Sequence, residues 1–113
     1  MAVVSNKLED AVECLRAHYF GEYIRVAAGD RPGRQRKPAP DSTFAALEQL
    51  DLAPGEALFV GDSDVDIMTA ENAGMPCLSV SWGFRDEAFL LAHGAKAIAA
   101  TAEEATQYIL ERI

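Results

Sequence analysis

The stretch LFVGDSDVD, residues 58–66, decides how the rest of the chain is interpreted. An apolar run of strand character ends at Gly61, and three acids, Asp62, Asp64 and Asp66, follow it. The next residues carry apolar side chains at helical spacing, so the stretch predicts a buried parallel strand, a tight turn and a helix. Carboxylates at the carboxyl end of such a strand lie where open α/β sheets bind ligands.

Two interpretations of these acids are open. Clustered carboxylates on a turn suit Mg²⁺, which takes one or two protein carboxylates together with phosphate oxygens and water. Acids in the first turn of a helix also complement the helix dipole without binding any ligand. The stretch alone does not separate a metal site from an ordinary helix start, so the choice depends on the rest of the chain.

The composition indicates one acidic globular domain. The chain has 113 residues, half of them hydrophobic, so we expect residues 1–113 to form a single domain with its own core. A formal net charge of −8 argues against nucleic acid or an anionic membrane as the main partner. The sequence shows neither a membrane span nor a signal peptide, and we expect a cytoplasmic protein with Cys14 and Cys77 as buried free thiols.

Strand-type and helix-type patterns alternate along the chain. Strands are expected at residues 2–4, 24–28, 58–60, 76–81 and 97–99. Helices are expected between them and at the carboxyl end, and in the second helix the spacing predicts that Phe44, Leu47 and Leu50 are buried. Regular alternation with short connections predicts a three-layer α/β fold with a mainly parallel sheet and helices on both faces.

A basic loop precedes the second helix. Residues 31–37 carry four of the ten basic side chains of the chain, which is the clearest concentration of positive charge in an acidic protein. The loop is either a local positive site for a small phosphorylated ligand or a solvated surface segment, and the charge run alone does not decide between them.

Four features occur in register with the predicted strands. Ser5-Asn6 ends the first strand, Lys37-Pro38 lies in the basic loop, the acidic stretch ends the third strand, and residues 81–84 end the fourth. This ordered set resembles the haloacid dehalogenase superfamily, and most closely its phosphoglycolate phosphatase-type hydrolases, over essentially the whole chain. The resemblance implies a Rossmann-like core and a Mg²⁺-dependent phosphatase that acts on a small phosphorylated metabolite through an aspartyl phosphate.

The resemblance also implies roles for single residues. Ser5 would hydrogen-bond the transferring phosphoryl group, and Asn6 would either bind substrate or hold the turn. Lys37 would offset negative charge on the nucleophile and the phosphate. Asp62 would bind Mg²⁺, and Asp66 would support the metal shell or the lysine. Phosphoryl transfer depends mainly on positioning and charge neutralisation, and these groups supply both.

One part of the family pattern is missing from this sequence. The family carries its nucleophile in an Asp-x-Asp motif at the end of a first strand, and no such motif precedes Ser5. We therefore expect the carboxyl-terminal part of a longer hydrolase, without its central strand and cap domain, and inactive alone. The missing strand would lie between those at 2–4 and 58–60. Either these two strands close up within one chain, or two chains associate as a homodimer through the exposed strand edges, which is the outcome we favour.

Two alternative functions belong to other classes. A non-catalytic phosphate- or metal-binding module would keep the fold without the nucleophile. A receiver-type signalling domain also combines acids, a hydroxyl and a lysine on an α/β sheet. It requires the lysine late in the chain, however, whereas Lys37 precedes the acids here.

Overall fold

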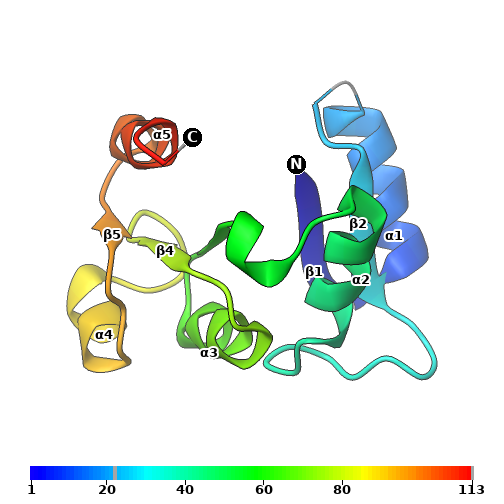
Figure 1. Ribbon diagram of the computed structural model, residues 1–113, viewed down its shortest axis with the longest axis horizontal. Helices are drawn as coiled ribbons and strands as arrows, with labels where there is room; N and C mark the ends of the chain where they lie inside the picture. Colours follow the sequence, from blue (N-terminus) through cyan, green and yellow to red (C-terminus); the bar gives the residue numbers. More distant parts are fainter. Residues whose placement is uncertain (22, 113) are drawn as a thin grey trace.

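Strands and helices alternate in the order that the sequence predicts (Figure 1). The computed structural model describes residues 1–21 and 23–112. Its strands are β1 (Ala2–Leu8), β2 (Val26–Asp30), β3 (Phe59–Gly61), β4 (Cys77–Val80) and β5 (Ile98–Ala99). Its helices are α1 (Glu9–Leu15), α2 (Asp41–Leu50), α3 (Asp64–Ala73), α4 (Glu87–Ala92) and α5 (Ala102–Leu110), with a π-helical turn η1 (Arg16–Phe20) and a 3₁₀ turn η2 (Pro54–Glu56).

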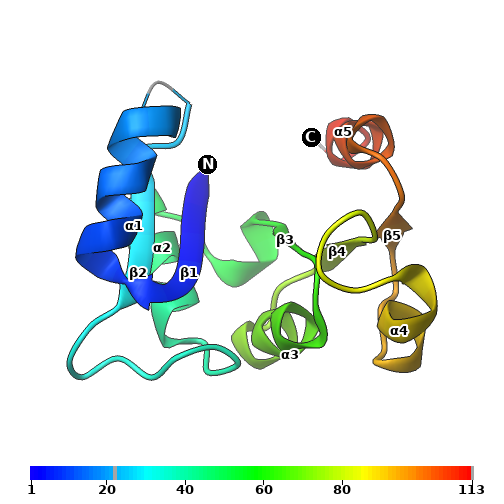
Figure 2. The same ribbon diagram turned by 180° about the vertical axis from the view of Figure 1, so that it is seen from behind.

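All strand pairs are parallel, as predicted, but the described strands form two sheets instead of one. β1 pairs with β2 in the first sheet, and the order β3-β4-β5 makes up the second. Across the molecule the strands follow the order β2, β1, β3, β4, β5 in both views (Figures 1 and 2). β1 and β3 are therefore neighbours that share no hydrogen-bonded ladder, at the place where the sequence predicts a missing strand.

Each sheet has its own hydrophobic core. In the first sheet, α2 covers one face and α1 the other (Figures 1 and 2), and Val26, Ala28 and Ala46 form the buried cluster. In the second, the buried residues Leu78, Val80, Ala99 and Ala105 join β4, β5 and α5. The two clusters share no residue, so each sheet has its own buried packing.

The buried face of α2 differs from the predicted one. Leu47 is buried and Leu50 packs against the core of the first sheet, as expected. The prediction for Phe44 is wrong, because this side chain is 44% exposed. The residues of α2 that are buried are Ser42, Thr43, Ala46 and Leu47, and at 100° per residue Phe44 lies on the opposite side of the helix.

Both cysteines are free, but the prediction that both are buried is wrong for Cys14. Cys14 is exposed on α1, where Val12 is the side chain that enters the core. Cys77 is half-buried at the start of β4, and burial raises the pKa of its thiol to about 11. The two thiols therefore differ in their access to solvent.

We expect iodoacetamide at pH 8 to alkylate Cys14 well before Cys77. The pKa of Cys77, about 11, lies about 3 units above that pH, so only about one molecule in 10³ carries its thiolate. Its alkylation rate should rise about tenfold per pH unit below the pKa. Intact-mass spectrometry of Cys14→Ser and Cys77→Ser variants measures each thiol separately, and equal rates at pH 8 would contradict the assignment.

Candidate active site at the junction of the two sheets

The ion pair between Lys37 and Asp66 lies at the centre of the candidate site. Lys37 Nζ is 2.9 Å from Asp66 Oδ1, and the two side chains are only 15% and 10% exposed. The other carboxylate oxygen, Asp66 Oδ2, accepts hydrogen bonds from Asp62 N at 3.0 Å and Ser63 Oγ at 3.2 Å. Both oxygens of Asp66 are therefore engaged within the protein.

Local sequence explains why the acidic turn adopts this shape. Ser63 is the N-cap of α3, in an extended conformation, and its Oγ accepts a hydrogen bond from Asp66 N at 3.4 Å. A Cβ atom at Gly61 would overlap the side chain of Asp66. Only glycine at the end of β3 therefore lets the carboxylate fold back over the strand.

Asp62 is held by the loop that follows β4. Its Oδ2 accepts a hydrogen bond from Phe84 N at 3.0 Å, and its carbonyl accepts one from Arg85 N at 3.2 Å. A Cβ atom at Gly83 would overlap Asp62 Oδ2, so glycine is required for this close approach. Within the described part of the chain, Asp62 Oδ1 has no hydrogen-bond partner and remains available to a ligand.

Two asparagines hold the backbone that carries Lys37. Asn6 Oδ1 accepts a hydrogen bond from Lys37 N at 2.9 Å, and Asn6 Nδ2 donates one to Lys37 O at 3.5 Å. Asn72 Nδ2, near the end of α3, donates to Pro38 O at 2.9 Å. The lysine turn, with a cis peptide bond between Lys37 and Pro38, is thus anchored to both halves of the molecule. Of the two roles expected for Asn6, this geometry favours holding the turn.

Ser5 lies outside this cluster. It does not end the first strand as predicted, because β1 continues to Leu8, with an irregular register between Val4 and Leu8. Its side chain is half-buried, and its Oγ accepts a hydrogen bond from Lys7 N at 3.1 Å. Among the described residues no hydrogen bond joins Ser5 to Lys37 or to Asp62. The hydrogen bonds of the described residues therefore connect four of the five predicted site residues and leave Ser5, on the first sheet, outside this network.

The other side chains of the basic loop have acidic partners. Arg31 and Arg34 contact Glu9 at 3.3 and 2.7 Å, and Arg36 contacts Asp30 at 2.8 Å. The hydrogen bond from Arg34 holds the pKa of Glu9 below its ordinary value. Because these charges are paired, the loop is better described as a structural segment than as a free positive patch.

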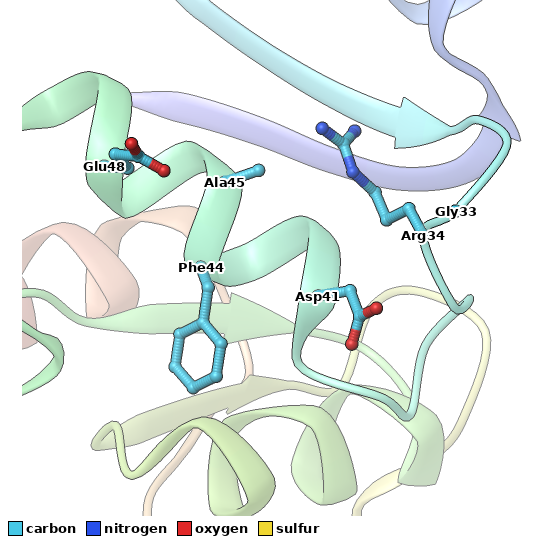
Figure 3. A pocket seen from close by; sticks show the side chains of 6 residues that line it. All are labelled: Gly33, Arg34, Asp41, Phe44, Ala45 and Glu48. Atoms are coloured by element: carbon cyan, nitrogen blue, oxygen red, sulfur yellow. The ribbon is translucent and has the colours of Figure 1, made fainter.

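A cavity of about 330 Å³ lies between this loop and α2 (Figure 3). Its lining includes Arg34, Asp41 and Phe44, with the Phe44 ring directed away from Arg34. Arg34 is bound to Glu9 and to the Gly29 carbonyl, which leaves it little capacity for a ligand. None of the predicted site residues lines this cavity, so we do not assign the site to it.

The described residues fit a magnesium ion only in part. They contain no group of three or more histidines, cysteines or acids that could hold a metal. Asp62 offers one carboxylate oxygen, whereas Asp66 is committed to Lys37. Magnesium takes one or two protein carboxylates and completes its shell with water and phosphate, so Asp62 is the residue that would hold it.

Sequence reasoning missed Asn72 and the backbone of residues 83–85. Asn72 carries no local signal, because an asparagine near the end of a helix is ordinary. Gly83 was one feature of a matching loop, but its contact with Asp62 spans more than twenty residues of chain and becomes visible only in the fold.

The described residues also include no helix that is long and apolar enough to cross a membrane.

Comparison with known proteins connects this geometry to one family. The sequence pattern of a family described as haloacid dehalogenase-like hydrolase matches residues 1–80. Phosphoglycolate phosphatase from Pseudomonas fluorescens is 34% identical over 85 residues, which are 74% of this chain and 31% of that protein. Pyrophosphatase PpaX from Bacillus cereus is 35% identical over 94 residues, which are 82% of this chain and 44% of that protein.

A solved structure shows the same fold. The crystal structure of a candidate phosphoglycolate phosphatase from Lactobacillus delbrueckii subsp. bulgaricus superimposes with a TM-score of 0.92 over 96% of this chain, at 42% sequence identity. This chain covers 45% of that protein. The chain thus spans between about a third and a half of the length of the relatives it matches.

We expect Asp66→Ala to lower the free energy of unfolding by about 3 kcal/mol, because it leaves the mostly buried side chain of Lys37 without its charged partner. Asp64→Ala is the matched control, since Asp64 lies in the same helical turn, and its effect should stay below about 1 kcal/mol. Urea denaturation followed by circular dichroism at pH 7 measures both. The double variant Lys37→Met/Asp66→Leu should recover most of the lost stability. Equal losses in Asp66→Ala and Asp64→Ala would contradict this account.

Proposed function

The chain belongs to the haloacid dehalogenase-like hydrolases, and we propose that the protein of which it forms a part is a Mg²⁺-dependent phosphatase that hydrolyses a small phosphate monoester. The observation that carries the proposal is the paired Lys37 and Asp66 beside Asp62, at the carboxyl ends of strands. Residues 1–113 would then be the carboxyl-terminal portion of the hydrolase core, which agrees with the partial coverage of the relatives.

The proposed roles follow from what each side chain can do. Lys37, held by Asp66 and by the amide of Asn6, presents a fixed positive charge to phosphate oxygens. Ser5 supplies a hydroxyl donor from within β1, and Asp62 Oδ1 is the oxygen left for Mg²⁺. When bound, the metal would neutralise charge on the phosphoryl group. Asp66 acts through Lys37 as a positioning residue.

The attacking group is proposed to come from outside these residues. In the family that the sequence resembles, an aspartate forms the covalent phosphoenzyme, and water then releases phosphate. This sequence carries no Asp-x-Asp motif before Ser5. The site as described can therefore bind and orient a phosphate but has no identified nucleophile.

Phosphoglycolate is the substrate class that we favour, because both Pseudomonas fluorescens phosphoglycolate phosphatase and the Lactobacillus structure are similar to this chain. Pyrophosphate is the second candidate, since PpaX from Bacillus cereus is 35% identical to it. The two differ in their leaving group, a hydroxy acid or a second phosphate. A non-catalytic phosphate- or metal-binding module with the same fold remains the alternative from another class.

We expect the chain alone to hydrolyse para-nitrophenyl phosphate, phosphoglycolate and pyrophosphate no faster than background in the presence of Mg²⁺. Loss of a covalent nucleophile removes many orders of magnitude of rate. The product of the complete gene, assayed in parallel, should show Mg²⁺-dependent turnover that falls at least about 10²-fold in Lys37→Ala but little in Asp64→Ala. If the chain alone hydrolyses a substrate and Asp62→Ala abolishes this activity, the proposal that these residues lack the nucleophile is refuted. If the product of the complete gene is inactive, the non-catalytic binding module is favoured.

We also expect the chain alone to bind Mg²⁺ weakly, with a dissociation constant well above micromolar. A single available carboxylate leaves the ion mostly hydrated. Isothermal titration calorimetry should show that Asp62→Ala removes the residual binding, whereas Asp64→Ala does not. Submicromolar binding would mean that Asp66 leaves Lys37 and joins the metal shell.

A further inference from the structure

We propose that Arg85 is a positioning residue, which holds the carboxylate of Asp62 in the orientation that a bound metal ion requires. The inference rests on the proposed function in one respect, namely that Asp62 is the residue that would hold Mg²⁺. Arg85 N donates a hydrogen bond to Asp62 O at 3.2 Å, and Phe84 N donates one to Asp62 Oδ2 at 3.0 Å. Two consecutive backbone amides thus hold both the main chain and the side chain of Asp62.

The loop that carries these two amides has few restraints of its own. Residues 82–85 belong to no helix or strand, and the side chain of Phe84 is 72% exposed. Gly83 is required for the close approach to Asp62, and glycine gives the backbone more conformational freedom than any other residue. The position of the Phe84 amide therefore depends on contacts that the side chains of the loop make.

The side chain of Arg85 makes such contacts. Its guanidinium carbon lies 4.4 Å from the centre of the Phe84 ring and 4.3 Å from the centre of the Phe89 ring. Both values are within the range of a cation–π interaction, about 6 Å. No ion pair of the described chain includes Arg85, and its Nε is buried there without a hydrogen-bond partner. The guanidinium group therefore connects the loop to α4 through the two rings.

The ring of Phe89 is itself held in place. Leu90, the next residue of α4, is fully buried and anchors the helix in the core. Asp86 is the N-cap of this helix, and its Oδ1 accepts a hydrogen bond from Phe89 N at 2.8 Å. One turn later His93 stacks on the Phe89 ring, with 4.0 Å between the ring centres and 22° between their planes. Phe89 thus offers Arg85 a fixed surface.

The orientation of Asp62 matters because its carboxylate turns easily. The terminal torsion of an aspartate is broad, so Oδ1 keeps one direction only while Oδ2 is held. Magnesium demands near-ideal octahedral geometry, and Asp62 Oδ1 is the oxygen left for it. Loss of the hydrogen bond from Phe84 N would let this oxygen turn away. Arg85 acts through Phe84 and needs no contact with the substrate.

The test compares the product of the complete gene with its Arg85→Met variant, which keeps an unbranched side chain but loses the charge. By NMR, the Phe84 amide of the variant should exchange its hydrogen at least about 5-fold faster. By isothermal titration calorimetry, its affinity for Mg²⁺ should fall about 10-fold, as is typical when a residue that orients a metal ligand is lost. The KM for phosphoglycolate at saturating Mg²⁺ should change less than about twofold, and added Mg²⁺ should restore turnover.

Two sets of variants serve as controls. Arg112→Met removes a cation–π contact of the same kind, since the Arg112 guanidinium lies 3.2 Å from the centre of the Tyr108 ring, and it should change neither Phe84 exchange nor Mg²⁺ affinity. Phe89→Leu removes the ring under Arg85 and should act like Arg85→Met, whereas Phe89→Tyr keeps the ring and should behave like the unmodified protein. If Arg85→Met does not fold, the two Phe89 variants make the same comparison.

The alternative roles of Arg85 give different results. A raised KM for phosphoglycolate, with Mg²⁺ affinity and Phe84 exchange unchanged, would overturn the proposal and assign Arg85 to substrate binding. A lower melting temperature with both quantities unchanged would also overturn it and leave a purely structural role. If the unmodified protein neither binds Mg²⁺ nor hydrolyses phosphoglycolate, the proposed function fails. The exchange of the Phe84 amide still decides in that case whether Arg85 positions the loop on Asp62.

Discussion

The ion pair between Lys37 and Asp66 is the interaction on which the arrangement of the molecule depends. No ladder joins the two sheets in the described chain, so the connection between them rests on α2, α3 and the lysine turn. A buried pair often contributes little net stability, because desolvation of both charges offsets their attraction. The pair constrains how the two halves meet, since Lys37 and Asp66 satisfy each other only when the lysine turn and the acidic turn are in contact.

Two carboxylates that are four residues apart acquire different properties from their hydrogen bonds. Asp66 accepts from Lys37, from Ser63 and from the Asp62 amide, and both of its oxygens are used. Asp62 accepts from Phe84 N through Oδ2 and keeps Oδ1 open toward a ligand. The backbone around these turns therefore decides which acid is structural and which is available, although the residue type is the same.

Local signals explain how much of the fold could be predicted. The start and end of α3 follow from Ser63 as N-cap and from Gly74 as a left-handed C-cap with φ 72°, both of which are visible in the sequence. The separation into two sheets and the anchoring of Lys37 by Asn6 and Asn72 could not be predicted in the same way. They depend on contacts between residues about thirty positions apart, and no local pattern distinguishes an asparagine that reaches a distant backbone from one that faces water.

The burial errors have a common physical origin. Periodicity identifies an apolar stripe but does not show whether anything packs against it, and Phe44 belongs to a side of α2 that the first sheet does not cover. Val60 shows the same effect in a strand. The pattern predicts a buried strand, but β3 lies at the edge of the second sheet and Val60 is 46% exposed. Apolar residues that are exposed against expectation are therefore informative, because they mark faces that no described element of the chain covers.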